Sequence, residues 1–322
     1  MRMLKRTLST LVLAALATTA GAQGYPNKPV KLVVGFAPGG AADYVARSVG
    51  DALGRALGQP IVIENKAGAG SSIAADFVAK SAADGYTLLI ASPSSISVNP
   101  ALNPKLQYKP SDLQPVTKLT ASPLVIAVNP NIGINSVQEL VARAKKEPGK
   151  LNYATSGNGS APHLGASLFS LVAGVEMQHI PFRGGGPAIQ SVIAGDTQVT
   201  FGTPPSVLPQ VTAGRLKGLG VSTLERTPLF PDLPGMKEAG LPDYVLDFWY
   251  GFFVPAATPQ PIVQKLFEAT QEAMKQPGVK AALAREGTDV SLSTSPADFG
   301  AFLAKDEKFW VNLVKSAGVK LE

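Results

Sequence analysis

The 322-residue sequence contains no cysteine and only two histidines. The lack of cysteine excludes disulfides and thiolate chemistry, although it does not identify a cellular compartment. His163 and His179 have no carboxylates at metal-ligand spacing, which argues against a metal site. Gly68 and Gly70 lack the third glycine of a dinucleotide-binding fingerprint, and no lysine of a phosphate-binding loop follows any glycine turn. We therefore expect no metal and no cofactor.

The sequence also lacks a Gly-x-Ser-x-Gly nucleophile elbow. Ser156 or Ser160 together with His163 imitates a nucleophile pair, but no orienting acid is visible in the pattern. We therefore predict that the protein is not an enzyme, and we keep a serine hydrolase as a distant alternative.

Long apolar runs are absent except near the N-terminus, where residues 8–20 are apolar or small and too few to span a bilayer. A basic segment precedes this run and Ala20-Gly21-Ala22 ends it, a pattern typical of a cleaved secretory signal peptide. We predict a signal peptide over residues 1–22, a mature chain that begins near Gln23, and a soluble periplasmic protein.

The mature chain has little net charge. The formal charge of the full sequence is +6, but Arg2, Lys5 and Arg6 belong to the predicted signal peptide, so the remainder carries +3. This weak basic excess argues against a nucleic-acid partner. Hydrophobic residues make up 45% of the sequence and charged residues 16%, which, with the length of the chain, predicts two well-packed domains.

The stretch Val30–Asp43, VKLVVGFAPGGAAD, predicts a strand, a glycine turn and the start of a helix. Its first residues form a short apolar run, Pro38-Gly39-Gly40 breaks the pattern, and apolar residues then recur at helical spacing up to Leu57. Such a turn exposes free N–H groups and the positive end of the helix dipole, which bind anions without any catalytic side chain. Taken alone, an ordinary turn is the simpler interpretation, so repetition of the pattern decides its meaning.

The pattern occurs six times, three times in each half of the chain. Because ligands of open α/β sheets bind at the carboxyl ends of the strands, halves that face each other would bring six helix N-termini to one cleft. A small carboxylate fits such a cleft. The turns are Phe36–Gly40, Asn65–Ser72, Ser92–Ser95, Thr155–His163, Arg183–Gly186 and Gly202–Pro205.

We predict an α/β fold with two Rossmann-like domains and a central cleft, hinged by strands near Leu124–Val128 and Phe248–Val254. The first domain is expected to comprise residues 24–122 and 253–322, and the second residues 123–252. The second boundary stays open, with a position nearer Ser222 as the alternative. We expect loops over Asn99–Pro115 and Phe230–Asp243, which are rich in proline.

Several candidate residues have two interpretations that the sequence leaves open. Asp43 either caps its helix or holds an amine of the ligand, and His163 either donates to a carboxylate or satisfies a buried carbonyl. Arg183 either grips a carboxylate with its planar fork or lies at the rim. Aromatic candidates either form the cleft wall or belong to the core. The candidates are Phe36, Gly39, Gly40, Asp43, Ser92, Ser94, Ser156, Asn158, Gly159, Ser160, His163, Phe182, Arg183, Gly184, Thr203 and Trp249.

The chain also carries, in order, the motifs FAPGGAAD, ENKAGAGSS, AADGYTLL, SVQELVARAKKEPGKLNYATSGNGSAPHLG, HIPFRGGGPAIQSVIAGDTQVTF, GRLKGLGVSTLER and FWYGFFVPAATP. In this order, over essentially the whole mature chain, they resemble the substrate-binding proteins of tripartite tricarboxylate transporters, the TctC or Bug family. The chain departs from the usual family residues at Ser71, Arg183, Pro234-Gly235 and Ala256-Ala257-Thr258. Arg183 is the departure expected to change the pocket most.

The resemblance implies a periplasmic binding protein of type II that closes on a small carboxylate and delivers it to an integral membrane permease. The family spans di- and tricarboxylates, amino acids and aromatic acids, so the ligand itself stays open. We expect the protein to be a monomer. The alternative of a different class is a ligand-sensing protein of the same fold that docks a signalling receptor.

Overall fold

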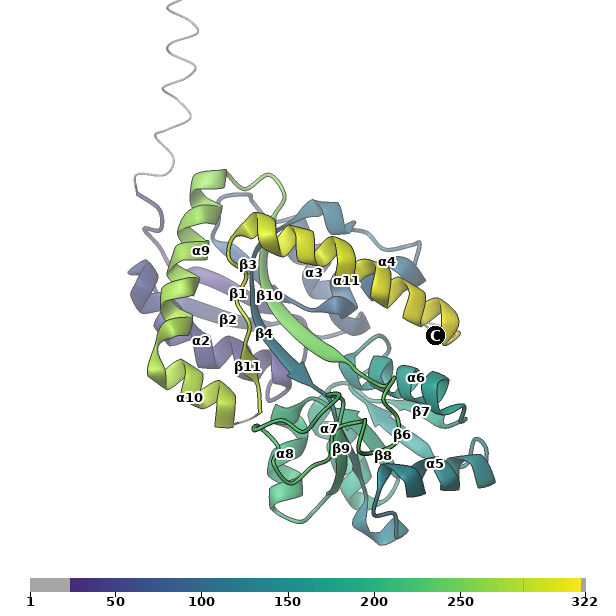
Figure 1. Ribbon diagram of the computed structural model, residues 1–322. Coiled ribbons are helices and arrows are strands. Elements are labelled where there is room, and N and C mark those ends of the chain that lie inside the picture. Colours follow the sequence, from purple (N-terminus) through teal and green to yellow (C-terminus); the bar gives the residue numbers. More distant parts are fainter. Residues whose placement is uncertain (1–23, 286, 320–322) are drawn as a thin grey trace, which may run out of the picture.

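The computed structural model describes residues 24–285 and 287–319. The predicted signal peptide lies outside these residues. The described chain forms two α/β lobes, each built on one β-sheet, and their sheets meet where strands pass from one lobe to the other (Figure 1). The predicted fold class is confirmed.

The sheet of lobe 1 has six strands, of which the central ones come from both ends of the chain. β1 pairs in parallel with β2 and β3, whereas β10 is antiparallel to β3 and β4. In spatial order the strands are β11 (Asp289–Val290), β4 (Leu113–Pro123), β10 (Asp247–Pro255), β3 (Thr87–Ala91), β1 (Val30–Val34) and β2 (Ile61–Asn65).

The sheet of lobe 2 has five strands and is likewise mixed. β6 is parallel to β7 and β8, and β5 is antiparallel to β8 and β9. The order is β7 (Gln178–Pro181), β6 (Asn152–Thr155), β8 (Val199–Gly202), β5 (Val125–Val128) and β9 (Lys217–Val221).

Both faces of each sheet are covered by helices. Successive side chains of a strand point to opposite faces, and the apolar side chains on each face pack against helices. Leu88 and Ile90 of β3 pack in one core cluster with helices α2 and α9, and Leu89 packs in another with α3 and α11. The helices of lobe 1 are α2 (Ala41–Leu57), α3 (Ser72–Ala79), α4 (Asn99–Leu102), α9 (Gln260–Lys275), α10 (Pro277–Arg285) and α11 (Pro296–Ser316), with short turns η1 (Ala69–Ser71), η2 (Ser94–Val98) and η3 (Pro110–Asp112).

Lobe 2 repeats this arrangement. Ile126 and Val128 of β5 face α5 and α6, whereas Val125 and Ala127 face α7 and α8. The helices are α5 (Val137–Lys146), α6 (Ala161–Ala173), α7 (Gly185–Ala194) and α8 (Pro204–Thr212), with the short turn η4 (Pro130–Ile132).

The two connections between the lobes are tied to each other by hydrogen bonds. Only Leu124 separates β4 in lobe 1 from β5 in lobe 2, and its N–H donates to Ser222 Oγ at 2.8 Å. The Ser222 N–H donates to the Leu124 carbonyl at 2.9 Å, and the Leu246 N–H donates to the Ser222 carbonyl at 2.9 Å. Ser222, which follows β9, and Leu246, which precedes β10, therefore fix the return connection beside the outward one.

The structure changes two details of the predicted organisation. All of β10 pairs within lobe 1, so a boundary at residues 252 and 253 would cut this strand, and the return connection lies before Asp247. The expected loop over 99–115 contains α4 and η3 and runs into β4, whose start at Leu113 the sequence pattern hid. Pro115 and Pro123 lack the N–H of a strand residue, but they lie near the beginning and at the end of β4, where proline is tolerated.

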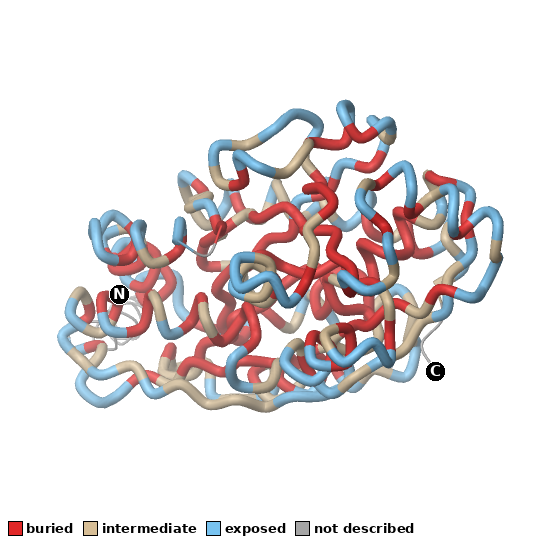
Figure 2. The backbone as a smooth tube through the Cα atoms, turned by 90° about the horizontal axis from the view of Figure 1, so that it is seen from below, coloured by how far each residue is buried: buried red, intermediate tan, exposed pale blue. Residues whose placement is uncertain are grey.

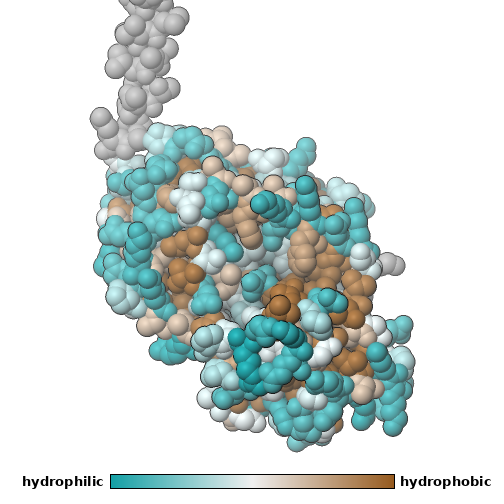
Figure 3. All heavy atoms as spheres, in the orientation of Figure 1, coloured by the Kyte–Doolittle hydropathy of each residue, from teal (hydrophilic) through white to brown (hydrophobic). Residues whose placement is uncertain are grey.

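In Figure 2, the buried segments lie in the interior of the molecule, and the exposed segments are mostly peripheral loops and outer helix turns. The face in Figure 3 is largely hydrophilic, with hydrophobic atoms confined to patches. Within residues 24–285 and 287–319, no helix combines the length and apolar character needed to cross a membrane.

Candidate functional site

Two adjoining cavities lie between the lobes, and Phe36 and Ser156 line both of them. Cavity 1 has a volume of about 40 Å³. Lobe 1 lines it with Phe36, Gly40, Ala41, Ala42, Phe248 and Tyr250, and lobe 2 with Ser156, Ala161, Pro162, Gly185, Ala188, Ile189, Thr200, Gly202, Thr203 and Ser206.

Cavity 2 is wider, with a volume of about 430 Å³. Its walls are mostly backbone and small side chains, and Arg183 is the one charged residue among those that line either cavity in the described part of the chain. It is lined by Gly35, Phe36, Ala37, Ala67, Gly68, Ala69, Gly70, Ser71, Ser156, Gly157, Asn158, Pro181, Phe182, Arg183 and Gly184.

The predicted convergence of strand-to-helix turns is present in the structure. The turns after β1, β2, β6, β7 and β8 all contribute residues to the two cavities. The turn after β3 does not, because Ser92 and Ser94 are buried away from the cavities and their hydroxyls have no hydrogen-bond partner among the described residues.

The helices that begin at the cavities have no side-chain caps. The N-cap residues of α2, α6 and α7 are Gly40, Ser160 and Gly184, and no side chain accepts a hydrogen bond from the first turn of these helices. By contrast, Ser136 caps α5 and Ser295 caps α11 through their hydroxyls, at N–H to oxygen distances of 3.1 and 3.0 Å. Because the first-turn N–H groups of a helix have no partner within the helix, α2, α6 and α7 leave donors free at the cleft.

Helix α8 also begins at cavity 1, with Thr203 as its N-cap residue. Pro204 and Pro205 occupy its first two positions and have no N–H. This helix therefore contributes the hydroxyls of Thr203 and Ser206 to the cavity rather than free backbone donors.

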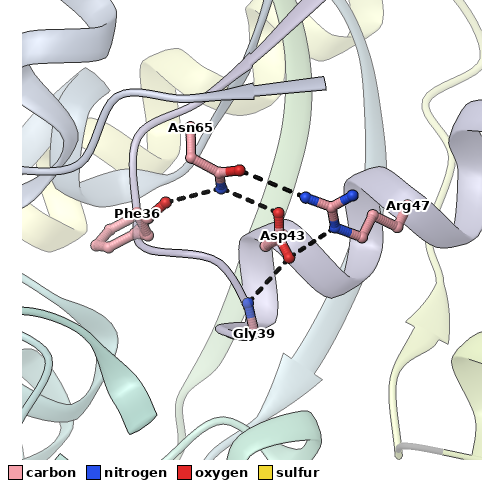
Figure 4. A network of polar contacts seen from close by, with 5 residues as sticks. All are labelled: Phe36, Gly39, Asp43, Arg47 and Asn65. Carbon is pink, nitrogen blue, oxygen red and sulfur yellow. Dashed lines mark hydrogen bonds and ion pairs between the residues drawn. The ribbon is translucent and has the colours of Figure 1, made fainter. Parts of the chain in front are cut away.

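Asp43 holds the first turn in shape through a network of hydrogen bonds (Figure 4), and it lines neither cavity. One carboxylate oxygen accepts from the Gly39 N–H and from Arg47 Nε, each at 2.9 Å, and the other accepts from Asn65 Nδ2 at 2.9 Å. Asn65 also donates to the Phe36 carbonyl at 3.0 Å. Asp43 is only 2% exposed. Burial alone would raise its pKa, but the hydrogen bonds from Arg47, Gly39 and Asn65 together lower the pKa below its ordinary value.

The lobes touch directly through glycines at the rim of the cleft. A Cβ atom on Gly70 would lie 2.6 Å from the Asn158 carbonyl oxygen, and one on Gly159 would lie 2.5 Å from Asn99 Oδ1. Asn99 in turn donates to the Ala69 and Gly70 carbonyls. Only glycine allows this approach, so the structure shows the cleft with its lobes in contact.

His163 supports the loop before α6. Its Nδ1 accepts from the Gly159 N–H at 3.0 Å, so the neutral ring carries its proton on Nε2. The ring stacks on His179, with centroids 4.1 Å apart. Burial, with a smaller contribution from His179, lowers the pKa of His163 to about 3, and burial lowers the pKa of His179 to about 4.

Both rings are therefore neutral at pH 7. Since the unfolded chain binds protons below about pH 6.5 and the folded chain does not, this pair makes the fold less stable as the pH falls below that value. Nδ1 of His163 therefore supports the loop before α6, and the Nε2–H is the ring's donor. Donation from His163 to a carboxylate or to a buried carbonyl stays a prediction.

Ser160 and His163 do not form a nucleophile pair. The Ser160 hydroxyl donates to the Gly157 carbonyl at 2.6 Å, and His163 Nδ1 is already occupied by Gly159. In the part of the chain that the structure describes, no three acidic or histidine side chains are grouped to hold a metal ion.

The structure brings half of the predicted residues to the cavities. Five of the others support the turns and line neither cavity: Gly39, Asp43, Gly159, Ser160 and His163. Ser92 and Ser94 are buried elsewhere. Those that line a cavity are Phe36, Gly40, Ser156, Asn158, Phe182, Arg183, Gly184 and Thr203.

Trp249 needs a correction, because it lines neither cavity. It packs against Phe253 and Phe299 on the far face of the lobe 1 sheet, and its Nε1 donates to Asp306 at 2.8 Å. The neighbouring residues Phe248 and Tyr250 point to the opposite face and line cavity 1. The period-two alternation of β10 places Phe248 and Tyr250 on the face opposite to Trp249, but it does not say which face meets the cleft.

Comparisons with known proteins agree with this geometry. A family model described as "Tripartite tricarboxylate transporter family receptor" matches residues 45–319. Protein BugT of Bordetella pertussis strain Tohama I is 36% identical over 311 residues, covering 96% of this chain and 95% of BugT.

Solved structures give the same picture. A structure of an R. palustris protein with adipate has a TM-score of 0.88 and 31% identity, covering 92% of this chain and 100% of that one. MatC from Rhodopseudomonas palustris with bound malate has a TM-score of 0.85 and 32% identity, covering 90% and 100%. Solved relatives also include a periplasmic transporter and the periplasmic binding protein BugD, which are 37% and 31% identical.

The Asp43 network predicts a pH-dependent effect on stability. Asp43→Asn removes hydrogen bonds to a buried charge, so we expect it to lower the free energy of unfolding by about 1.5–3 kcal/mol at pH 7. Because the folded-state pKa lies below the ordinary value of 3.8, this stabilisation is complete above pH 3.8 and is lost as the pH falls through the folded-state pKa. Urea unfolding of both proteins between pH 3 and 7 measures the difference.

The matched control is Asp51→Asn, at an exposed position of the same helix, which should change the free energy by less than about 0.5 kcal/mol. A deficit of Asp43→Asn that stays constant down to pH 3 would contradict the assigned charge.

Proposed function

The chain belongs to the tripartite tricarboxylate transporter receptor family, and from that premise we propose that it is an extracytoplasmic solute-binding protein. It captures a small organic carboxylate in the cleft between its lobes and delivers it to the transporter. The observation that carries this proposal is the set of uncapped N-termini of α2, α6 and α7 around a cavity that no acidic side chain lines.

The ligand class follows from the chemistry of the two cavities. Free N–H groups and hydroxyls in cavity 1 suit one carboxylate, because both kinds of donor stabilise negative charge. Cavity 2 has room for the rest of the ligand, and Arg183 offers a cation for a second carboxylate. Relatives of this chain hold adipate and malate, which are both dicarboxylates. We propose a di- or tricarboxylate, or an aromatic acid that packs against Phe36 and Phe182.

The proposed contacts are the predicted residues that line the cavities, joined by Phe248 and Tyr250 from β10. Closure is proposed to occur by rotation of the lobes about the connections at Leu124 and between Ser222 and Leu246, where few residues link the lobes. An open cleft admits the ligand, and the contacts at Gly70 and Gly159 form when it closes.

Delivery implies a partner in the membrane. We propose that the protein acts as a monomer in the periplasm and docks the integral membrane permease subunits of a tripartite transporter. The family supports this assignment, since its solved members include periplasmic binding proteins. Export would use residues 1–22 as a signal peptide that is cleaved near Ala22, outside the described residues.

Thermal-shift and calorimetric titration of the mature protein test the proposal. The panel is succinate, malate, adipate, citrate and phenylacetate, with succinamide as a neutral and putrescine as a cationic control. An acid present at 100 times its Kd should stabilise the fold by about 2.7 kcal/mol. The proposal fails if only the neutral or cationic compounds raise the melting temperature, or if none of the acids does.

Gly159→Ala tests whether binding requires the lobes to touch. Gly159 has a φ of +71°, and an added Cβ would lie 2.5 Å from Asn99 Oδ1 across the cleft. We expect the Kd for the best acid of the panel to rise by about tenfold or more, because overpacking opposes closure.

The control is Gly174→Ala, at the other end of α6, where φ is +61° and nothing lies within 4 Å of the added Cβ. This variant has a similar backbone strain without the clash, so it should lose stability but not affinity. Equal Kd values for the two variants in calorimetric titration would show that closure at this contact is not needed.

A further inference from the structure

The hydroxyl of Tyr250 has no hydrogen-bond partner among the described residues. Tyr250 lines cavity 1 and is 7% exposed. By contrast, the hydroxyls of Tyr25, Tyr44 and Tyr108 each donate to a backbone carbonyl at 2.6 Å. The Tyr244 hydroxyl also has no partner among the described residues, but Tyr244 lines neither cavity. The Tyr250 side chain is buried as a whole, but its hydroxyl is not among the fully buried unpaired atoms of the described residues. Because Tyr250 lines cavity 1, this hydroxyl is open to a ligand there.

The backbone fixes the direction of this side chain. The pairing of β10 with β4 shifts register between Tyr250 and Gly251, as at a β-bulge, which re-aims a side chain next to a site. A Cβ on Gly251 would lie 2.5 Å from the Phe299 ring, so the strand is held closely on its far side. Tyr250 therefore faces cavity 1 beside Phe248 as a fixed group.

The hydroxyl acts as a donor at neutral pH. Burial raises the pKa of Tyr250 above its ordinary value, so the phenol keeps its proton. It faces the first turns of α2, α6 and α7, whose free N–H groups are donors as well. Such a set of donors suits an oxygen anion.

The same cavity has no group that could neutralise an ammonium. No Asp or Glu lines it, and the carboxylate of Asp43 is occupied by Gly39, Arg47 and Asn65. An amino group next to the bound carboxylate would lie among positive helix ends without a counter-charge, which is unfavourable in a buried site.

We infer that Tyr250 is a specificity-determining residue whose hydroxyl donates to the carboxylate of the ligand in cavity 1, and that this cavity takes a carboxylate with no amino group on the adjacent carbon. This inference rests on the proposed function and narrows it. It assigns the acid group to cavity 1 and leaves the remainder of the ligand to cavity 2.

Tyr250→Phe removes the hydroxyl and nothing else. The probe is whichever acid of the panel (succinate, malate, adipate, citrate or phenylacetate) binds the wild type most tightly. We expect its Kd to rise about 10- to 100-fold in calorimetric titration, as for the loss of a hydrogen bond to a charged group. We expect the urea midpoint of the ligand-free variant to be unchanged or raised, because no hydrogen bond of the protein is lost.

Two tyrosines provide matched controls. Tyr108→Phe breaks a hydrogen bond to the Ser95 carbonyl and should lower the urea midpoint without changing the Kd. Tyr244→Phe removes a buried hydroxyl that has no partner among the described residues and does not line either cavity. It should leave the Kd unchanged and leave the urea midpoint unchanged or raised. A Tyr250→Phe protein that binds the probe as tightly as the wild type, or that fails to fold, overturns the role assigned to the hydroxyl.

The amino-group arm compares acids that differ at one substituent. Aspartate should bind the wild type at least tenfold more weakly than succinate, and phenylglycine more weakly than phenylacetate. The pair that decides is the aliphatic one if the probe is an aliphatic acid and the aromatic one if the probe is phenylacetate. If the amino acid of that pair binds as tightly as its parent acid or more tightly, cavity 1 does not exclude an amino group. If no acid binds at all, the proposed function fails instead, so the two failures are distinct.

Discussion

The cleft depends on backbone N–H groups at helix N-termini that the protein itself leaves without side-chain partners. A side-chain cap at a helix N-terminus contributes about 0.5–2 kcal/mol relative to alanine. The chain uses such caps at Ser136 and Ser295, away from the cleft, and omits them at α2, α6 and α7. These helix ends therefore sacrifice some stability of the empty protein and keep their donors for a ligand.

Free donors are useful only if their positions are fixed, and two buried groups fix them. In lobe 1, the Asp43 carboxylate accepts hydrogen bonds from the Gly39 N–H, Arg47 and Asn65. In lobe 2, His163 accepts one from the Gly159 N–H. Each side chain acts on the backbone that approaches the ligand rather than on the ligand itself. The two lobes thus solve the same problem with different chemistry: a charged carboxylate in one and a neutral imidazole in the other.

Much of this arrangement is visible in the sequence. The Val30–Asp43 stretch predicts its strand, turn and helix because hydrophobic period and glycine placement are local signals. The start of β4 was missed because Asn99–Pro115 is rich in proline, which gave it the appearance of a loop. The partners of Asp43 and His163 lie in tertiary contacts, so no local pattern distinguishes a supporting residue from a ligand contact.

Trp249 shows how narrow that difference is. Trp249 and Tyr250 are adjacent aromatic residues of one strand, and the pleat sends one into the core and the other into cavity 1. Composition alone favours neither residue. The register of β10 against β4 and β3 decides between them, and pairing over such a sequence separation is not encoded in a short window.

The most direct measurement is a ¹H–¹⁵N NMR titration of the mature protein with the acid that binds most tightly. The account predicts that the amides of Ala41, Ala161 and Gly185, in the first turns of α2, α6 and α7, shift the most and move downfield as they gain an anionic acceptor. Their shifts should saturate with the Kd found by calorimetry. If these three amides stay in place while the protein saturates with ligand, backbone donors from both lobes do not hold the carboxylate, and the account is wrong.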